Sequence, residues 1–330
     1  MARDDLHSPA MVRAKLASSV RSFRQNLVYF SFVAILLFFS ITIHDRGFLS
    51  LFNLMNILRQ TAVVSIMAVG MTFALAAREI DLSIGSLVSL SALTTAVVLS
   101  RLHSIPLAML ASLGIGVATG LVNGFITTKA KVPAFLTTLG TAGVLSGLAM
   151  SITNSESIPI LNESFNFYFG SGDVGPVSTL FLWTVVILLI GHMLLKHTTF
   201  GRAVLATGGN RSAARFSGIR TDATRIAALV ICSLTASFAG MLYAGRLHSA
   251  RYTLGESDVM TVIAAAIIGG TSFSGGRGTI IGAFVGSIVM GMLNNGLLLI
   301  GLSGANQTIA LGVIVVIAIT VSLRESLEAQ

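Results

Sequence analysis

The chain has 330 residues, of which 54% are hydrophobic and only 10% are charged, and its formal net charge at pH 7 is +8. An average soluble domain is about one-quarter charged, so this composition excludes a water-soluble globular protein. Apolar stretches recur along the whole length and predict an all-α polytopic membrane protein. The single cysteine, Cys232, excludes a disulfide framework and a cysteine-based metal site.

Apolar runs long enough to cross a bilayer, which takes about 20 helical residues, occur about ten times. We expect spans at 27–43, 57–77, 84–100, 106–128, 133–152, 178–195, 225–245, 259–272, 279–300 and 306–323. The eighth is short and leads into a glycine-rich stretch, which predicts a broken or re-entrant helix. The chain then divides into an N-terminal tail at 1–26, one membrane domain at 27–323 and a C-terminal tail at 324–330.

Basic residues set the expected orientation, because Lys and Arg concentrate in cytoplasmic loops. With the N-terminus inside, most of the 21 Lys and Arg residues fall on the cytoplasmic side. The outside keeps only Arg46, Arg59, Arg101, Arg246 and Arg251. An even number of spans places the C-terminus inside as well. We therefore interpret the net charge as a topology signal and expect no nucleic-acid partner.

Two connections between spans are long. The stretch 153–177 faces outside, carries acidic and aromatic residues, and is expected to form an interfacial or extracytoplasmic lid. The stretch 196–224 faces the cytoplasm and contains the polar segment GGNRSAARFSGI, from Gly208 to Ile219.

Small residues recur at intervals of four in three spans, and such ridges let helices pack closely in lipid. The three sets are Gly116, Gly120 and Gly124, then Gly143 and Gly147, then Gly278, Gly282 and Gly286. We interpret each set as a helix-packing surface, either within one subunit or between two.

The chain lacks the sequence motifs of common enzyme and nucleotide sites. It has no G-x-x-x-x-G-K-[ST] loop to hold the phosphates of ATP, and no H-E-x-x-H, G-x-S-x-G or Cys/His cluster. We therefore expect neither enzyme activity nor a metal or cofactor site in this chain.

The segment REIDLSIGS, from Arg78 to Ser86, is a charged break between two apolar runs. Asp81 and Ser83 lie where the third span begins, and an Asp there can cap the helix and meet its positive end. Alternatively, this polar break lies near a transport pathway and helps to shape or gate it. The spans otherwise offer no convincing ionisable group at mid-membrane, which argues against a proton-coupled carrier.

The segment GGNRSAARFSGI predicts a stubby helix between glycine hinges. Asn210 or Ser212 can cap its start, and Gly218 can end it. Its small side chains leave a smooth surface with Phe216 as an apolar knob, which suits docking into a cleft on a partner. The alternative is an ordinary loop helix that rests on lipid headgroups through its arginines.

Three segments in combination resemble the inner-membrane permeases of bacterial ATP-binding-cassette (ABC) sugar importers, and most of all the ribose/xylose/arabinose type. They are REIDLSIGSLVSLSA, TTFGRAVLATGGNRSAARFSGI and IIGGTSFSGGRGTIIGAFVGSIVMGMLNNGLLLIGLS. The resemblance covers about residues 50–320, and the wider family includes branched-chain amino-acid permeases. It implies an all-helical fold of about ten spans, similar to the vitamin B12-type (type II) importers.

The resemblance also implies partners. Two permease subunits, either two copies or this chain with a sister permease, would enclose one pathway. Cytoplasmic ATPase subunits, often fused in tandem, would bind the ATP, and a periplasmic binding protein would deliver a monosaccharide, with a pentose as the first expectation. The chain itself would lie in the bacterial inner membrane and bind no cofactor.

The segment Gly208–Ile219 matches the family's coupling region, so the resemblance assigns ATPase coupling to it. The coupling candidates are Gly209, Asn210, Ala213, Ala214, Arg215, Ser217 and Gly218. The pathway or gating candidates are Asp81, Ser83, Gly269, Gly270, Asn294 and Asn295, of which the two asparagines either line the outer mouth or hydrogen-bond within the bundle. The candidates for docking the binding protein are Arg59, Arg246 and Arg251, which otherwise anchor to lipid headgroups.

The sequence departs from the family pattern at one turn. The family commonly has a glycine just before Ile-Asp-Leu-Ser, where this chain has Arg78 and Glu79. Glu79 is expected to pair with Arg78, and the departure counts against ribose as the substrate. A branched-chain amino-acid permease and a stand-alone secondary carrier remain the alternative functions.

Overall fold

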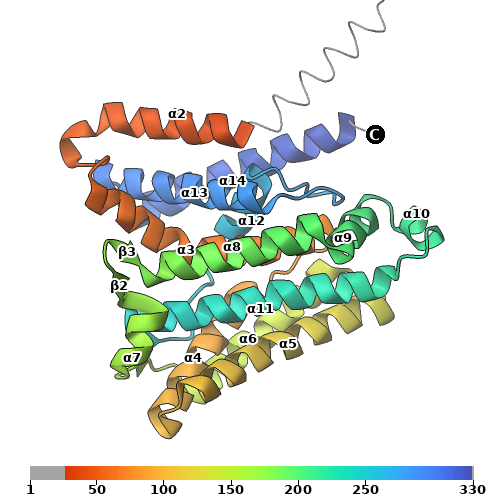
Figure 1. Cartoon of the computed structure of the whole chain (residues 1–330), viewed down its shortest axis with the longest axis horizontal. Helices are drawn as coiled ribbons and strands as arrows, with labels where there is room; N and C mark the ends of the chain where they lie inside the picture. The colour runs from red at the N-terminus through yellow and green to blue at the C-terminus, as the bar shows by residue number, and fades with distance from the viewer. Residues whose placement is uncertain (1–26, 329–330) are drawn as a thin grey trace, which may run out of the picture.

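The computed structural model describes residues 27–328, which fold almost entirely into helices (Figure 1). The long helices are α2 (Leu27–Thr42), α3 (Leu51–Ala76), α4 (Ile84–Leu102), α5 (Ile105–Lys129), α6 (Ala134–Thr153), α8 (Thr179–His197), α11 (Thr221–Leu247), α13 (Ile280–Ile300) and α14 (Gly304–Glu328). The shorter helices are η2 (His44–Arg46), α7 (Glu163–Asn166), η3 (Phe167–Ser171), α9 (Thr199–Gly209), α10 (Arg211–Phe216) and α12 (Asp258–Ile268). The strands are β1 (Ile158–Pro159), β2 (Asp173–Val174), β3 (Val177–Ser178) and β4 (Ser249–Ala250), paired antiparallel as β1 with β4 and β2 with β3.

Each of the ten expected spans coincides with a helix. Seven helices of the described chain are long and apolar enough to cross a membrane, namely α3, α4, α5, α6, α8, α11 and α13, and shorter apolar helices lie at Val28–Thr42, Asp258–Ile268 and Gly304–Ile317. The prediction of an all-helical polytopic membrane protein is therefore confirmed. The N-terminal tail at 1–26 lies outside the described residues, and α14 continues to Glu328 through most of the segment assigned to the C-terminal tail.

The second span begins six residues earlier than expected. Ser50 caps α3 by accepting a hydrogen bond from the backbone N–H of Asn53 at 3.2 Å. The asparagines at 53 and 56 interrupt the apolar run, so the hydropathy pattern alone placed the start at 57. The helix tolerates Asn53 because its buried amide is hydrogen-bonded to Phe48 and Asn295.

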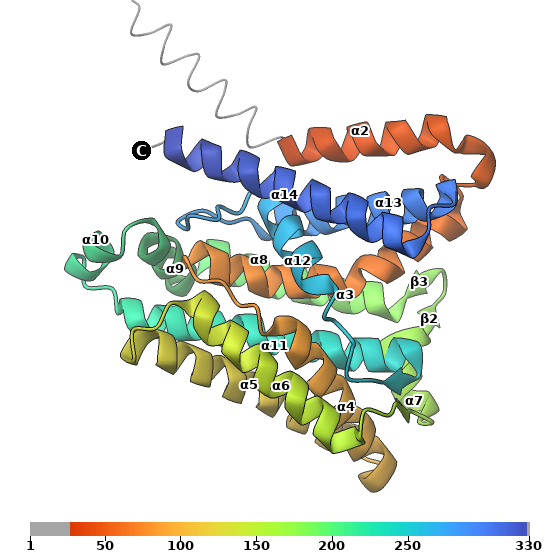
Figure 2. The ribbon, with the colours of Figure 1, turned by 180° about the vertical axis from the view of Figure 1, so that it is seen from behind.

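The two ends of the helix bundle carry different features (Figures 1 and 2). The small helix α10 lies at one end, and α7, β2 and β3 lie at the opposite end. We refer to these as the α10 end and the α7 end. Helix α14 finishes toward the α10 end in both views.

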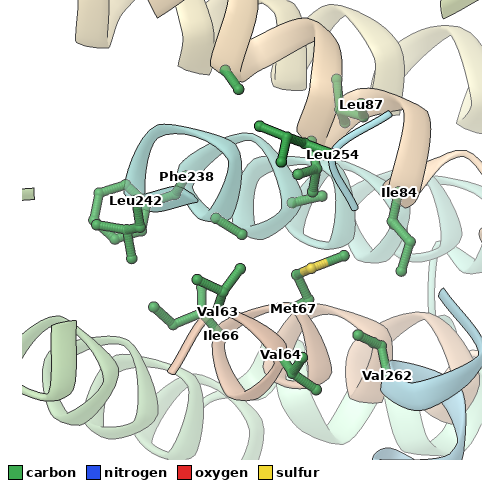
Figure 3. Packing of buried hydrophobic residues seen from close by; sticks show 14 of the residues in the cluster. Val63, Val64, Ile66, Met67, Ile84, Leu87, Phe238, Leu242, Leu254 and Val262 are labelled. Atoms are coloured by element: carbon green, nitrogen blue, oxygen red, sulfur yellow. The ribbon is translucent and has the colours of Figure 1, made fainter. Parts of the chain in front are cut away.

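The hydrophobic core lies around α3, α4 and α11. Within the most apolar window of each helix, 83% of the residues of α3, 72% of α4 and 61% of α11 are buried, against 22% for α6. In Figure 3, Val63 of α3 lies opposite Leu242 of α11, and Met67 points toward the side of Ile84 in α4. Helices α5, α6 and α8 leave most of their apolar surface uncovered, as expected of helices that face lipid.

Two of the three small-residue sets pack within the chain. A side chain at Gly120 would overlap the backbone of Val230 in α11, and one at Gly282 would overlap the backbone of Gly269 after α12. Gly143 and Gly147 of α6 have no neighbouring atom within 4 Å of a built Cβ. The first and third sets are therefore packing surfaces inside one subunit, whereas the set on α6 has no partner in the described chain.

Helix α12 has 11 residues and, at 1.5 Å per residue, extends roughly 16 Å, which is too short to cross a bilayer. The short helix agrees with the expectation of a broken or re-entrant eighth span. A non-helical segment, residues 269–279, connects α12 to α13 and contains the glycine-rich sequence. We call this segment the glycine loop.

The long connection 153–177 packs against the α7 end of the bundle. It contains β1, α7, η3, β2 and the first residue of β3, and β1 pairs with β4 after α11. Phe169 stacks on Trp183 of α8 with ring centroids 5.5 Å apart, and Gly170 lies directly against the backbone of Gly245 in α11. The connection therefore covers the ends of α8 and α11.

Candidate functional site

Helix α10 is built from the local signals in its sequence. Asn210 is its N-cap, with its side-chain oxygen accepting from the backbone N–H of Ala213 at 3.0 Å. At the other end Gly218 takes φ +84°, and the N–H groups of Gly218 and Ile219 donate to the carbonyls of Arg215 and Ala214. These bonds form a Schellman motif, which needs a left-handed residue and so favours glycine. The predicted stubby helix and its caps are therefore confirmed.

The outer surface of α10 is free in the described chain. Phe216 is 93% exposed, and Ala213 and Ser217 are exposed as well. Ala214, by contrast, is only 4% exposed and faces the protein. A partner that docks on α10 in this conformation therefore reaches Ala213 and Phe216 but not the methyl group of Ala214, which the sequence placed in the docking surface.

Three segments distant in the sequence meet beside α10. Gly208, near the end of α9, lies against the carbonyl of Ala76 at the end of α3, where a Cβ would overlap it. Gly276 of the glycine loop donates its N–H to the same carbonyl at 3.0 Å. A Cβ built at Gly276 would overlap the Cα of Gly209. The end of α3, the end of α9 and the glycine loop therefore touch through backbone atoms, which only glycine permits at Gly208 and Gly276.

Glu79 ties α10 to the same region through ion pairs. Its carboxylate accepts from Arg225 of α11 and from Arg211 of α10, the latter at 3.2 Å. Glu79 is 3% exposed and the side chain of Arg225 is 8% exposed. The expected pair between Glu79 and Arg78 is wrong, because Arg78 takes a left-handed φ of 64° after α3 and does not contact the carboxylate.

The two arginines of α10 differ in their surroundings. Partial burial, followed by repulsion from Arg225, lowers the pKa of Arg211 from its ordinary value, although a guanidinium stays charged at neutral pH. Arg215 is mostly exposed and pairs with Asp222 of α11 at 3.3 Å. Arg215, a predicted ATPase contact, therefore lies on the accessible side of the helix and already has a partner in its own chain.

Asp81 and Ser83 lie in a fully buried polar network. Both are 0% exposed, and the carboxylate of Asp81 accepts from the backbone N–H of Ser83 at 2.9 Å and from the hydroxyl of Ser233 in α11 at 3.4 Å. Asn123 of α5 donates to the hydroxyl of Ser83 at 3.0 Å, and Thr141 of α6 donates to Asn123 at 2.7 Å. The break before α4 therefore joins α5, α6 and α11.

The position of Asp81 along the membrane axis is deeper than the sequence suggested. Ser233 lies twelve residues after Thr221, the first residue of α11, or roughly 18 Å along the helix. A carboxylate in contact with Ser233 therefore lies beside the middle of the 27-residue helix α11 and not at its end. It does not cap α4 in the usual way either, because Ser83 is the N-cap residue and its own side chain makes no capping bond.

The other pathway candidates separate into structural and accessible residues. Gly269 and Gly270 form the C-terminal cap of α12, where Gly270 takes φ +90°. Asn295 is buried and exchanges two hydrogen bonds with Asn53 of α3, at 2.9 and 3.0 Å. Asn294 is exposed. Of the two roles open to the asparagines, Asn295 therefore hydrogen-bonds within the bundle, while Asn294 remains a candidate for lining a mouth.

The three arginines expected to dock a binding protein lie toward the α7 end. Arg59 of α3 forms an ion pair with Asp173 of β2. Arg246 is the penultimate residue of α11 and is partly buried, and Arg251 directly follows β4 and is exposed. The structure therefore places all three on the same side of the bundle but leaves Arg59 already neutralised.

The sequence did not predict which distant residues join this site. Asn123 and Ser233 each lie within an apolar span, and Arg225 lies where a span follows an expected cytoplasmic connection. Their position in or beside a span is the signal that could have found them, because a polar group inside a membrane span needs a partner. The spacing of such residues does not say which partner that is.

Comparisons with known proteins agree with this architecture. A family model described as "Branched-chain amino acid transport system / permease component" matches residues 53–319. The ribose import permease protein of Escherichia coli strain K12 is 38% identical over 279 residues, which cover 83% of this chain and 87% of that protein. No solved structure matches the chain at a significant level, so the likeness to the vitamin B12-type fold stays a prediction.

Two further relatives cover similar shares of the chain. The galactose/methyl galactoside import permease protein of Haemophilus influenzae is 34% identical over 316 residues, which cover 90% of this chain and 94% of that protein. A probable ABC transporter permease protein of Escherichia coli strain K12 is 34% identical over 292 residues, covering 88% and 87%. These matches confirm the resemblance that the sequence motifs indicated. The chain belongs to the family of transport-system permease components, and it is a multi-pass membrane permease and not an enzyme.

Proposed function

We propose that this chain is the transmembrane permease subunit of an ABC importer that carries a monosaccharide into the bacterial cell. The full-length relatives named for a substrate are permeases for ribose and for galactose or methyl galactoside, which supports a sugar. The chain has no ATP-binding loop of its own, so partner ATPase subunits supply the energy. A periplasmic binding protein delivers the sugar.

A branched-chain amino-acid permease is the closest alternative, because the family description names that class of substrate. Relatives that cover more than four-fifths of the chain include permeases named for ribose and for galactose or methyl galactoside, and this favours the sugar. A stand-alone carrier is disfavoured, since similar relatives include a probable ABC transporter permease. The buried Asp81 accepts hydrogen bonds from the hydroxyls of Ser83 and Ser233, which gives it a structural role in joining the break before α4 to α11.

The observation that carries the proposal is the arrangement around α10. A short capped helix presents an apolar side chain, Phe216, to the outside of the molecule. Its other side is joined by Arg211 and Glu79 to the turn before Asp81, and the preceding helix α9 meets the glycine loop where Gly208 contacts Gly276. A displacement of α10 by a docked ATPase is therefore transmitted to the segments before α4 and α13.

The proposed cycle is alternating access between two conformations. ATP binding closes the ATPase dimer and moves α10, and the rearranged spans release sugar that the binding protein has delivered at the α7 end. Any such shift requires the ligand to bind the two conformations with different affinity. Arg246 and Arg251 are the available cations for acidic groups of the binding protein, because Arg59 is paired with Asp173.

The proposed orientation places the α10 end and both termini in the cytoplasm and the chain in the inner membrane. The pathway is enclosed by a second permease, either another copy or a sister chain. The ATPase is either a pair of subunits or a tandem fusion. These details follow the distribution of Lys and Arg and the family resemblance.

The docking surface is tested by Ala213→Glu, which places a bulky charge on the exposed side of α10. Co-purification of the ATPase in mild detergent and sugar uptake are expected to fall at least tenfold, while membrane insertion stays normal. Ala130→Glu is the matched control, because Ala130 is exposed at the same end of the bundle between α5 and α6. Normal co-purification and uptake in A213E would refute docking on α10.

A further inference from the structure

A cleft of about 600 Å³ opens near the α10 end, and the function proposed above assigns no ligand to it. It lies between the turn that follows α3, the junction of α5 with α6, and the α10–α11 region. Its lining residues of interest are Arg78, Glu79, Thr127, Lys131, Arg211 and Arg225. Ligand pockets in proteins are typically about 300–1,000 Å³, so this cleft has room for a small metabolite or a headgroup.

The charge in the cleft is strongly positive. Five basic residues line it, namely Arg78, Lys131, Arg211, Arg215 and Arg225, against two acidic residues, Glu79 and Asp222. The acidic residues pair with the three arginines of α10 and α11. Arg78 and Lys131 form no ion pair or hydrogen bond through their side chains within the described chain. Two cations therefore line the cleft without a counter-charge.

The backbone at these two cations is unusual in the same way. Arg78 has φ 64° and Lys131 has φ 59°, and each directly follows the C-cap residue of a helix, α3 and α5 respectively. Glycine is the ordinary residue at such left-handed positions because it carries no Cβ. Lys129 already supplies a cation to the last turn of α5. The chain accepts this backbone conformation at both positions, as it does at His103, Asn154, Ser155 and His248.

A third observation points to a ligand. Thr127 lines the cleft and is 2% exposed, yet its hydroxyl has no hydrogen-bond partner. A buried hydroxyl without a partner is unfavourable, so native structures normally satisfy it. The hydroxyl of its neighbour Thr128 donates a hydrogen bond to the carbonyl of Gly124 at 2.8 Å and is therefore satisfied within the chain. The hydroxyl oxygen has less than 1 Å² of exposed surface, so a ligand oxygen in the cleft would become its acceptor once the Thr127 side chain rotates toward the cleft.

We propose that this cleft binds a phosphate-bearing anion from the compartment that α10 faces. Arg78 and Lys131 pair with the phosphate oxygens and the hydroxyl of Thr127 donates to one of them, since charge-assisted bonds of this kind are the strong ones. The phosphate belongs either to a soluble sugar phosphate or to an anionic lipid headgroup. An anion held here bridges the turn beside Glu79 and the arginines of α10, so its binding affects the link through which α10 would act.

The test uses the full-length permease without its ATPase, so that failure of the docking proposal does not affect it. The protein is placed in phosphatidylcholine nanodiscs and titrated with ribose 5-phosphate, with ribose as the uncharged comparison. Binding of the phosphate ester but not of ribose is expected. The variant R78Q/K131Q should bind at least tenfold more weakly, and Thr127→Val several-fold more weakly with an unchanged Tm.

Three matched variants separate the cleft from general charge. Lys129→Gln and Arg202→Gln remove exposed cations at the same end of the bundle, and Thr207→Val removes another buried hydroxyl without a partner. None of these residues lines the cleft. All three variants are expected to bind ribose 5-phosphate as the unmodified protein does. Equal weakening by the controls and by R78Q/K131Q would refute a specific site.

A second arm identifies a lipid source of the phosphate. Nanodiscs containing phosphatidylglycerol are examined by native mass spectrometry for lipid that stays bound to the permease. Retention by the unmodified protein and loss in R78Q/K131Q, with no binding of ribose 5-phosphate, assigns the cleft to a lipid headgroup. If neither probe distinguishes the unmodified protein from R78Q/K131Q, the proposal is wrong.

Discussion

Glu79 illustrates how one residue holds two helices of this permease together. It is a buried carboxylate with two arginine partners, one on α10 and one on α11. Replacing Glu79 with Ala leaves Arg225 buried without its counter-charge, and breaking a buried pair in this way costs about 3–5 kcal/mol. The Tm of E79A measured in detergent should fall clearly.

The control for this prediction is Glu163→Ala, which removes an exposed carboxylate at the α7 end. Its Tm should be unchanged, since exposed charges contribute little to stability. Equal Tm values for E79A and the unmodified protein would mean that the ion pairs do not stabilise the fold.

Asn294 and Asn295 are adjacent in sequence but differ in what they do. Replacing Asn295 with Ala leaves the buried amide of Asn53 without two of its hydrogen bonds, which should cost about 1–3 kcal/mol. Replacing the exposed Asn294 with Ala should change stability by less than about 0.5 kcal/mol. Thermal unfolding of the two variants checks this, and a larger loss in N294A would reverse the assignment.

The glycine-rich sequence of the glycine loop did not indicate which helix the loop packs against. Gly276 has φ +77°, and a Cβ there would overlap Gly209 of α9. Gly276→Ala should therefore separate the loop from α9 and reduce sugar uptake severalfold. Gly301→Ala is the matched control, because Gly301 has φ +93° but open space around its Cβ position. Equal losses in both variants would mean that backbone strain alone, and not the contact, is responsible.

Local signals predicted the elements of this chain well. The caps of α10 at Asn210 and Gly218 and the short α12 are where the sequence placed them, because caps and apolar runs act over a few neighbouring residues. The start of α3 was misplaced because a local pattern shows Asn53 as a polar residue that is unfavourable in a span, and does not show its distant partner Asn295. Pairing across 242 residues is not encoded in any local pattern.

The orientation of the whole molecule can be measured directly. Ser212 on α10 and Val174 in β2 are exposed and lie at opposite ends of the bundle. Each is replaced with Cys in a Cys232→Ser background, so that the introduced thiol is the only one in the chain. We expect a membrane-impermeant maleimide to label V174C in spheroplasts and S212C only after permeabilisation. The reverse labelling pattern would invert the proposed topology and place the docking helix outside the cell.

The sequence by itself determined the membrane class, the approximate positions of ten helices and the short polar helix α10. These properties depend on hydrophobicity and capping, which each segment carries alone. The family resemblance likewise rested on contiguous motifs. The sequence also located the polar break at Asp81, but it did not show that Asp81 lies deep among the helices.

Only the tertiary structure decided which residues act together. It paired Glu79 with Arg211 and Arg225 instead of Arg78, buried Asp81 against Ser233, and left Gly143 and Gly147 without a partner in the described chain. The cleft with Arg78 and Lys131 arises in the same way from three separate segments. Each depends on how helices far apart in the sequence pack, and helix packing follows from shape and partner satisfaction across the whole bundle.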